Sequence, residues 1–132
     1  MLKSDTTEIP EVIRDEPRFD QRGVIVDVAQ EYFDQGFMKL LVDVLAQVKV
    51  NKILLHMIDD DSFAFEMPSL SDSASKTAFT PDEIYTLAQV ENFVAYAKER
   101  GITVNPEFSI PSRLRPFNEL GLDYLMTCHY KW

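Results

Sequence analysis

The sequence lacks the features that mark disulfide-bonded, cysteine-ligated and membrane-spanning proteins. It contains one cysteine, Cys128, so no disulfide forms within the chain and no CxxC metal motif exists. No apolar run approaches the ~18 residues of a membrane span, and the first residues contain no apolar segment of a signal peptide. There is no Asn-x-Ser/Thr glycosylation site either. We therefore expect no membrane span, and the compartment stays unknown.

Basic residues are scarce relative to acidic ones. The chain has 13 Lys and Arg against 22 Asp and Glu, a formal net charge of -9. Such a surface repels phosphate backbones, so we expect no nucleic-acid partner. Hydrophobic residues make up 45% of the 132 residues and charged residues 27%, which is typical of one globular domain.

Several catalytic motifs are also missing. The sequence contains no glycine-rich phosphate loop, no GxSxG nucleophile turn and no HExxH zinc motif. The chain therefore does not match the motifs of phosphate-loop enzymes, α/β hydrolases or HExxH metalloproteases.

The hydrophobic pattern predicts three buried strands separated by two amphipathic helices. The strands are short and rich in β-branched residues, and the helices carry apolar stripes at a 3.6-residue period. Asp34 is suited to cap the first helix, and Thr86 with Gln89 has the spacing of a capping box. The stripe of the first helix consists of Phe37, Leu40, Leu41, Val44, Leu45 and Val48. The predicted strands are 22–28, 51–58 and 102–108, and the predicted helices are 35–49 and 87–99.

This order of elements predicts an α/β fold. Because each connection contains a helix, the strands should be parallel with right-handed crossovers. The pattern fits half of a doubly wound sheet or the first three strands of a (β/α)₈ TIM barrel. A complete barrel needs about 250 residues, so the barrel would be incomplete in these 132 residues.

Three parts follow from this pattern. Residues 1–21 are polar and interrupted by prolines, as in a lead-in or linker, and residues 22–113 form the α/β domain, either half of a doubly wound sheet or a partial TIM barrel. Residues 114–132 form a C-terminal tail with an apolar turn around 120–126. The connection 59–85 shows no sustained period and is long for a compact domain, and such loops are often functional.

Polar residues follow each predicted strand. In parallel α/β folds ligands bind at the carboxyl ends of the strands, so we expect these side chains to converge on one mouth. They are Asp27 and Gln30 after the first strand, His56, Asp59, Asp60 and Asp61 around the end of the second, and Glu107, Ser109 and Arg113 after the third.

The same residues have structural explanations. Carboxylates after a buried strand often form a solvated loop or a helix cap, and we favour His56 as a core histidine with one hydrogen bond. Metal sites need three or four ligands. Adjacent aspartates on an extended chain point to opposite faces, so at most two of residues 59–61 can share an ion, and we expect no metal site. Asp59 and Glu107 are also candidates for the carboxylate pair of a glycosidase, and their sequence spacing alone does not show whether they form one.

Three segments, in order, resemble the family 20 glycoside hydrolases, the β-N-acetylhexosaminidases. They are PRFDQRGVIVDV, NKILLHMIDDDSFAFE and IYTLAQVENFVAYAKERGITVNPEFSIPS. The family pattern reads PRF..RG..LD, then N.LH.H..DD.SF..E, then YT..D...I..YA..RGI.V.PEFD.PGH. The resemblance runs from about Pro17 to Arg113 and covers the N-terminal part of the family's catalytic domain only.

The resemblance implies a TIM barrel that hydrolyses terminal N-acetylhexosamine from glycans. In that family the acetamido oxygen of the substrate attacks the anomeric carbon, a glutamate protonates the leaving oxygen and the preceding aspartate orients the acetamido group. No metal or organic cofactor takes part. Family members are commonly lysosomal or secreted and often dimerise.

The sequence departs from the family pattern around the expected site. Gln30 stands where the family has a sugar-binding arginine, and a neutral amide lacks the charged fork of arginine. Ser109, Ser112 and Arg113 replace the aspartate, glycine and histidine of the third segment. That histidine links the acid/base glutamate to the aspartate matched by Asp59. Asp59 is therefore expected to be the relay carboxylate by ancestry and to pair with Arg113 in this chain, while Asp60 is retained.

These departures shape the functional expectation. The family's Asp-Glu acid/base pair follows the fourth strand, whereas this sequence supplies three, so we expect a family 20 segment that is inactive as given. The alternatives are a non-enzymatic glycan-binding or partner-subunit pseudoenzyme, or a truncated gene product. The expected partner is an N-acetylhexosamine glycan, bound weakly or not at all. Unpaired strand edges also predict homo- or hetero-association.

Overall fold

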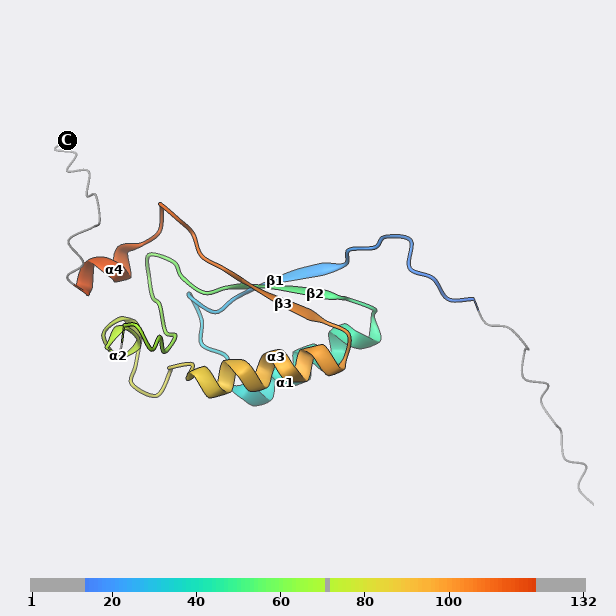
Figure 1. The fold of residues 1–132 in the computed structure, drawn as a ribbon, viewed down its shortest axis with the longest axis horizontal. Coiled ribbons are helices and arrows are strands. Elements are labelled where there is room, and N and C mark those ends of the chain that lie inside the picture. Colours follow the sequence, from blue (N-terminus) through green and yellow to red (C-terminus); the bar gives the residue numbers. More distant parts are fainter. Residues whose placement is uncertain (1–13, 71, 121–132) are drawn as a thin grey trace, which may run out of the picture.

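The computed structural model describes residues 14–70 and 72–120, which form a parallel three-stranded sheet with helices packed on one face (Figure 1). The strand order is β1-β2-β3 and both pairings are parallel, so the predicted α/β class is confirmed. The strands are β1 (Gly23–Asp27), β2 (Lys52–His56) and β3 (Thr103–Glu107), and the two long helices are α1 (Gln35–Gln47) and α3 (Leu87–Glu99). Two short helices, α2 (Ser73–Thr77) and α4 (Arg115–Glu119), lie beyond the carboxyl ends of the strands (Figure 1).

The register of the sheet aligns the last residues of all three strands. Asp27 of β1 pairs with His56 of β2, and His56 pairs with Glu107 of β3. Paired residues of neighbouring strands point to the same face of a sheet, so these three polar side chains share one face. Ile25, two residues before Asp27, lies on that face and is 70% exposed. The described helices therefore leave this face open.

The opposite face of the sheet packs against α1 and α3. Alternate strand residues point toward these helices, as the 2-residue period of a strand requires, and those of β2 are buried while those of β1 and β3 are buried less completely. The two helices contact each other as well as the sheet. This core includes Val26 of β1, Ile53 and Leu55 of β2, Met38, Val42 and Leu45 of α1, and Phe93 and Ala97 of α3.

Both long helices begin with the predicted caps. The Asp34 side chain accepts a hydrogen bond from the Phe37 amide at 2.8 Å. Thr86 and Gln89 form the reciprocal capping box, with the Gln89 amide donating to Thr86 Oγ1 and the Thr86 amide donating to Gln89 Oε1 at 2.9 Å. Gly101, with φ of +73°, follows the end of α3 in a conformation that glycine adopts without strain. Local sequence therefore determines where these helices start and stop.

The apolar stripe of α1 is only partly buried. Sequence periodicity placed Phe37, Leu40 and Val44 on the packing side, but they are 45%, 60% and 51% exposed. Leu45 of the predicted stripe is buried, and the helix also buries Met38 and Val42 against the sheet. The prediction was wrong for the exposed residues because α1 carries more apolar surface than one sheet face and one neighbouring helix can cover.

The connection 59–85 is more ordered than its sequence indicated. It contains α2 and two isolated β-bridges, Phe65 with Tyr85 and Met67 with Leu70. The Phe65 and Tyr85 rings stack with centroids 4.8 Å apart, and both residues are buried. Contacts between residues twenty positions apart therefore stabilise this long connection, in which the sequence shows no sustained period.

The segment after β3 packs back onto this connection. Helix α4 contacts α2, and the Phe117 ring lies 5.3 Å from that of Phe63 between centroids. The expected domain boundary at residue 113 stays a prediction, and the expected apolar turn at 120–126 lies outside the described residues except for Leu120. No helix within residues 14–70 and 72–120 is long and apolar enough to cross a membrane.

The exposed apolar residues of α1 predict self-association. We expect the purified chain to form larger species as its concentration rises, because a contiguous apolar surface is buried by contact. Substituting Leu40→Lys, which places a charge in this surface, should shift sedimentation velocity profiles toward the monomer. Gln47→Lys adds the same charge at an exposed polar position of the same helix and should leave association unchanged. Equal effects of the two variants would contradict a role for the apolar surface.

Candidate functional site

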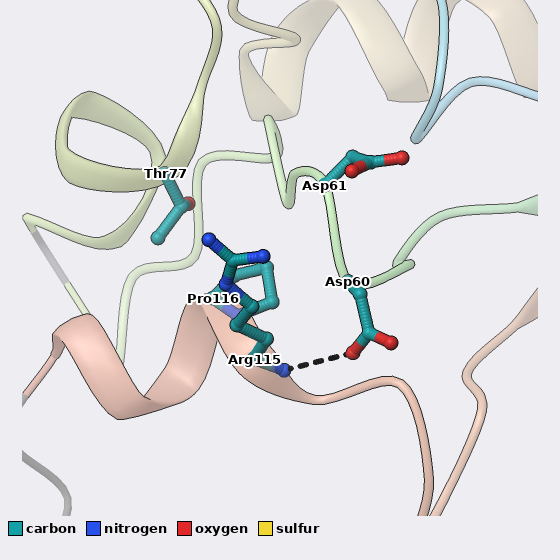
Figure 2. Close-up of a pocket in the computed structure, with 5 residues that line it drawn as sticks. All are labelled: Asp60, Asp61, Thr77, Arg115 and Pro116. Atoms are coloured by element: carbon teal, nitrogen blue, oxygen red, sulfur yellow. Dashed lines mark hydrogen bonds between the residues drawn. The ribbon is translucent and has the colours of Figure 1, made fainter.

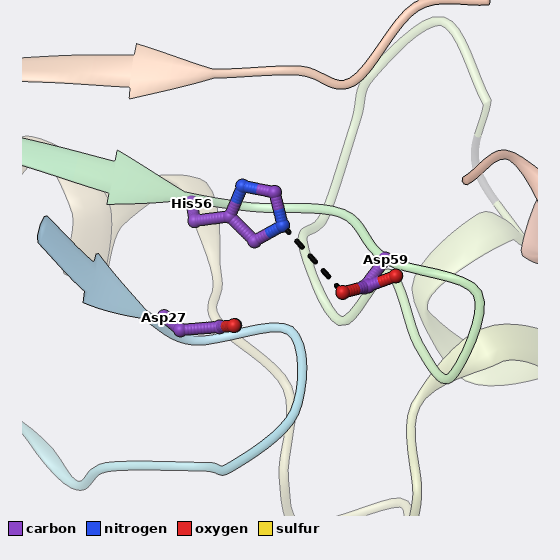
Figure 3. A group of neighbouring side chains, drawn as sticks. All are labelled: Asp27, His56 and Asp59. Atoms are coloured by element: carbon purple, nitrogen blue, oxygen red, sulfur yellow. Dashed lines mark ion pairs between the residues drawn. The ribbon is translucent and has the colours of Figure 1, made fainter. Parts of the chain in front are cut away.

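His56 is the buried centre of the polar cluster at the carboxyl ends of the strands. It is 7% exposed, and its Nδ1 lies 3.2 Å from Glu107 Oε2 of the neighbouring strand. Its Nε2 faces Asp59 Oδ2 at 3.8 Å (Figure 3) and has no hydrogen-bond partner. The expectation of a buried histidine with one hydrogen bond is confirmed, and its surroundings are carboxylates.

The turn after β2 is what buries Asp59. The Asp59 amide donates to the Ser62 carbonyl at 3.2 Å, closing the turn. The Ser62 hydroxyl donates to the Ala29 carbonyl at 2.5 Å, which ties this turn to the one after β1. The following Phe63 is fully buried. Apolar packing and two hydrogen bonds thus hold the Asp59 carboxylate at 6% exposure beside the ends of the strands.

Asp59 accepts hydrogen bonds from three different segments of the chain. Its Oδ1 accepts from the Asp60 amide at 2.7 Å, and its Oδ2 accepts from Gln30 Nε2 at 2.9 Å and from Arg113 Nη1 at 3.4 Å. The expected ion pair between Asp59 and Arg113 is therefore present. The residues at the altered positions 30 and 113 thus meet on one carboxylate oxygen.

These contacts lower the pKa of Asp59 below its ordinary value. The Asp60 backbone amide has the largest effect and the Gln30 side-chain amide the next, with smaller contributions from Arg113 and His56. Burial acts in the opposite direction because it disfavours the charged form. Hydrogen bonds and nearby positive charge outweigh burial, so Asp59 is a carboxylate at neutral pH.

Asp27 completes the cluster from the first strand. Its Oδ1 accepts from the Ala29 and Gln30 amides at 3.0 and 3.2 Å, which fixes the turn that carries Gln30. Ligand-type atoms of Asp27, His56 and Asp59 all lie within 4.8 Å of one another (Figure 3). Imidazole nitrogen and carboxylate oxygen are ligands for zinc and related divalent cations, so these are the residues that can hold a metal here.

Tyr85 hydrogen-bonds to the connection between β1 and α1, which also carries Gln30. Its hydroxyl donates to the Phe33 carbonyl at 3.1 Å and accepts from the Phe33 amide at 2.8 Å. Burial raises the pKa of Tyr85 to about 12, so the phenol stays protonated and remains a donor. The long connection thus positions the turn that carries Gln30, a role that local sequence did not indicate.

Most of the predicted site residues converge. Gln30, His56, Asp59, Glu107 and Arg113 form one connected cluster, and their expected roles in a sugar site stay predictions. Within the described residues, no hydrogen bond links Ser109 to this cluster.

Asp60 lies apart from the cluster, on the outer side of the turn after β2. Its side chain is exposed, and its Oδ1 accepts from the Arg115 amide at 3.4 Å. It lines a separate small polar pocket together with Asp61, Thr77, Arg115 and Pro116 (Figure 2). Asp60 therefore contributes to the buried cluster through its backbone amide.

Comparison with solved structures identifies the class of protein to which this sheet belongs. The exo β-N-acetylglucosaminidase of glycoside hydrolase family 20 from Vibrio harveyi superposes with a TM-score of 0.74 at 29% identity, covering 80% of this chain and 19% of that enzyme. The family 20 β-N-acetylhexosaminidase of Streptomyces coelicolor gives a TM-score of 0.67 at 29% identity over 74% of this chain and 21% of that one. The three parallel strands and their helices thus correspond to part of a (β/α)₈ barrel glycosidase.

Sequence comparison gives the family. Residues 19–127 match the model of "Glycosyl hydrolase family 20, catalytic domain", and the chain belongs to that family. It is 30% identical to human beta-hexosaminidase subunit beta over 117 residues, 89% of this chain and 21% of that protein. It is 37% identical to mouse beta-hexosaminidase subunit alpha over 118 residues, 89% of this chain and 22% of that protein. The chain spans about a fifth of the length of the curated relatives it matches.

The contacts of Asp59 predict a pH-dependent contribution to stability. At pH 7, Asp59→Asn should lower the free energy of unfolding by about 1–3 kcal/mol, because a buried hydrogen-bonded group loses matched partners. A lowered folded-state pKa stabilises the fold above the unfolded value, ~3.9, and the contribution is lost as the pH falls through the folded-state value. The difference between the native chain and the variant should therefore shrink below about pH 4.

Urea denaturation at several pH values measures this difference. Asp61→Asn removes the adjacent, exposed carboxylate and serves as the matched control, with an expected change within about 0.5 kcal/mol. A pH-independent effect of Asp59→Asn, or an equal effect at Asp61, would show that the Asp59 contacts do not act as described.

Proposed function

We propose that the polar end of the sheet is the strand 1–3 portion of an N-acetylhexosaminide site, and that the 132-residue chain does not hydrolyse such glycosides on its own. The family assignment supports the substrate class. The proposal rests on the surroundings of Asp59, which by resemblance stands at the position of the family's relay carboxylate. Asp59 is buried, and both Gln30 and Arg113 donate to its Oδ2.

The donors around Asp59 are unsuited to proton relay. Glycoside hydrolysis needs a group that protonates the leaving oxygen, and by family resemblance this group follows the fourth strand. A histidine at position 113 would pass a proton between that group and Asp59. Arg113 cannot, because a guanidinium stays protonated in proteins. It neutralises Asp59 and leaves the carboxylate without proton-transfer function.

The open face of the sheet supports weak sugar binding. Gln30 and Arg113 are exposed, so donors of both remain accessible to sugar hydroxyls while each also contacts Asp59. Buried His56 and half-exposed Glu107 belong to the same cluster, with His56 Nδ1 3.2 Å from Glu107 Oε2. A bound sugar would be covered from one side only by the described residues, which limits its buried area and therefore its affinity.

A partner-subunit role is the second candidate. The relatives include proteins named as subunits alpha and beta of beta-hexosaminidase. The exposed apolar residues of α1, Leu40 and Val44 among them, supply the kind of surface that subunits bury. The two candidates are compatible, since α1 lies on the side of the sheet away from the polar cluster.

An assay with a chromogenic N-acetylglucosaminide tests the absence of hydrolysis. We expect no product above the background of enzyme-free buffer, with the Vibrio harveyi enzyme as positive control. The Gln30→Arg and Arg113→His variants should be equally inactive, because neither change adds a group that protonates the leaving oxygen. Turnover by the native chain that a competitive family 20 inhibitor abolishes would contradict the proposal.

Binding is tested separately by titrating the isotope-labelled chain with N-acetylglucosamine and recording amide chemical shifts. The expected shifts lie at Gln30, Asp60 and Arg113, with a dissociation constant in the millimolar range, which corresponds to about 4 kcal/mol. Glucose, which lacks the acetamido group, should produce smaller shifts. Shifts confined to other parts of the chain, or none at saturating sugar, would contradict a retained sugar site.

A further inference from the structure

The unpartnered Nε2 of His56 is an unexplained feature of the polar cluster. The His56 side chain is 9% exposed, and buried polar atoms normally have a hydrogen-bond partner. Its Nδ1 lies 3.2 Å from Glu107 Oε2, and an ionised carboxylate only accepts, so Nδ1 carries the proton that is shared with Glu107. In a neutral imidazole the lone pair then lies on Nε2, which faces Asp59 (Figure 3).

We propose that Asp27, His56 and Asp59 form a binding site for a divalent cation of the zinc class. One nitrogen and two carboxylates satisfy the preferences of such ions, and the candidate ligand atoms lie within 4.8 Å of one another. Zinc bonds of about 2.0–2.2 Å hold ligand atoms closer than this, so binding draws the side chains together by about 1 Å. The open face of the sheet leaves the remaining coordination positions to water.

Groups around the proposed ligands hold their side chains in orientations suited to a metal ion. Metal-binding histidines usually donate their second ring N–H to a carboxylate, which fixes the tautomer and orients the ring. Glu107 occupies that position relative to His56. The Ala29 and Gln30 amides hold Asp27 Oδ1, which fixes the direction of its carboxylate. Two of the three ligands are therefore oriented before any ion arrives.

Arg113 is the group that competes with the cation. Its Nη1 lies 3.4 Å from Asp59 Oδ2, and its side chain is 57% exposed. This long contact to a solvent-accessible side chain contributes little, so the guanidinium can move into solvent when a cation binds. Gln30 can rotate its amide and present Oε1 in place of Nε2, because the two ends of the amide have nearly the same shape. Removing the charge of Arg113 should therefore strengthen metal binding.

The sequence predicts no metal site when only the consecutive residues 59–61 are taken as ligands of one ion. Only Asp59 of these belongs to the cluster. The second carboxylate, Asp27, comes from the neighbouring strand through the pairing of Asp27 with His56. Metal binding here does not depend on sugar binding, since it requires only the ligand atoms of Asp27, His56 and Asp59, including the unpartnered Nε2 of His56.

Isothermal titration of the 132-residue chain with zinc chloride tests the proposal. The chain carries Cys128→Ser and His129→Gln to remove the other strong zinc ligands from the sequence. We expect one zinc ion per chain. His56→Gln and Asp27→Asn should each weaken binding at least tenfold, and Glu107→Gln should weaken it by about 10–100-fold. Arg113→Gln should tighten binding, and Asp61→Asn should leave it unchanged.

Circular dichroism confirms that each variant is folded, and nitrogen chemical shifts of the imidazole identify the coordinating atom. Zinc should shift the His56 Nε2 resonance strongly and the Nδ1 resonance weakly. The proposal is overturned if the folded chain binds no zinc, if the affinity is the same in His56→Gln, or if Nδ1 is the nitrogen that responds.

Discussion

The in-register parallel pairing of β2 with both neighbouring strands brings the polar residues of the three strand ends together. It aligns Asp27, His56 and Glu107 at the last position of each strand, and it turns all three side chains toward the face that α1 and α3 leave open. A shift of one residue would move His56 to the helix-covered face. The apolar residues Ile53 and Leu55, buried against the helices, oppose such a shift.

Asp59 then joins the three strand ends into one network. Its position depends on the turn after β2, which the Ser62 hydroxyl ties to the turn after β1. The carboxylate accepts hydrogen bonds from Gln30, in the turn after β1, and from Arg113, in the segment after β3. The same arrangement lowers the pKa of Asp59. In the function proposed above, it also takes this carboxylate out of proton relay.

Much of this arrangement could be predicted from sequence. Periodicity gave the three strands and two helices, the caps at Asp34 and Thr86 marked helix starts, and the resemblance predicted the pairing of Asp59 with Arg113. The convergence of the strand-end residues, Asp27 among them, also followed from the expected parallel pairing. The order within the connection 59–85 could not be predicted locally, because it depends on contacts between distant residues, such as the stack of Phe65 on Tyr85. The exposure of the α1 stripe likewise depends on how much surface the neighbouring elements cover.

Donors from three segments hold Asp59 as a buried carboxylate at the strand ends. A pH titration of the Asp59 side-chain carbon resonance in the native chain tests this arrangement. We expect a midpoint below the ordinary value of ~3.9, and a midpoint that rises when Gln30→Leu removes the amide donor. A midpoint at or above the ordinary value, unchanged by that substitution, would show that these donors do not stabilise the charged form of Asp59.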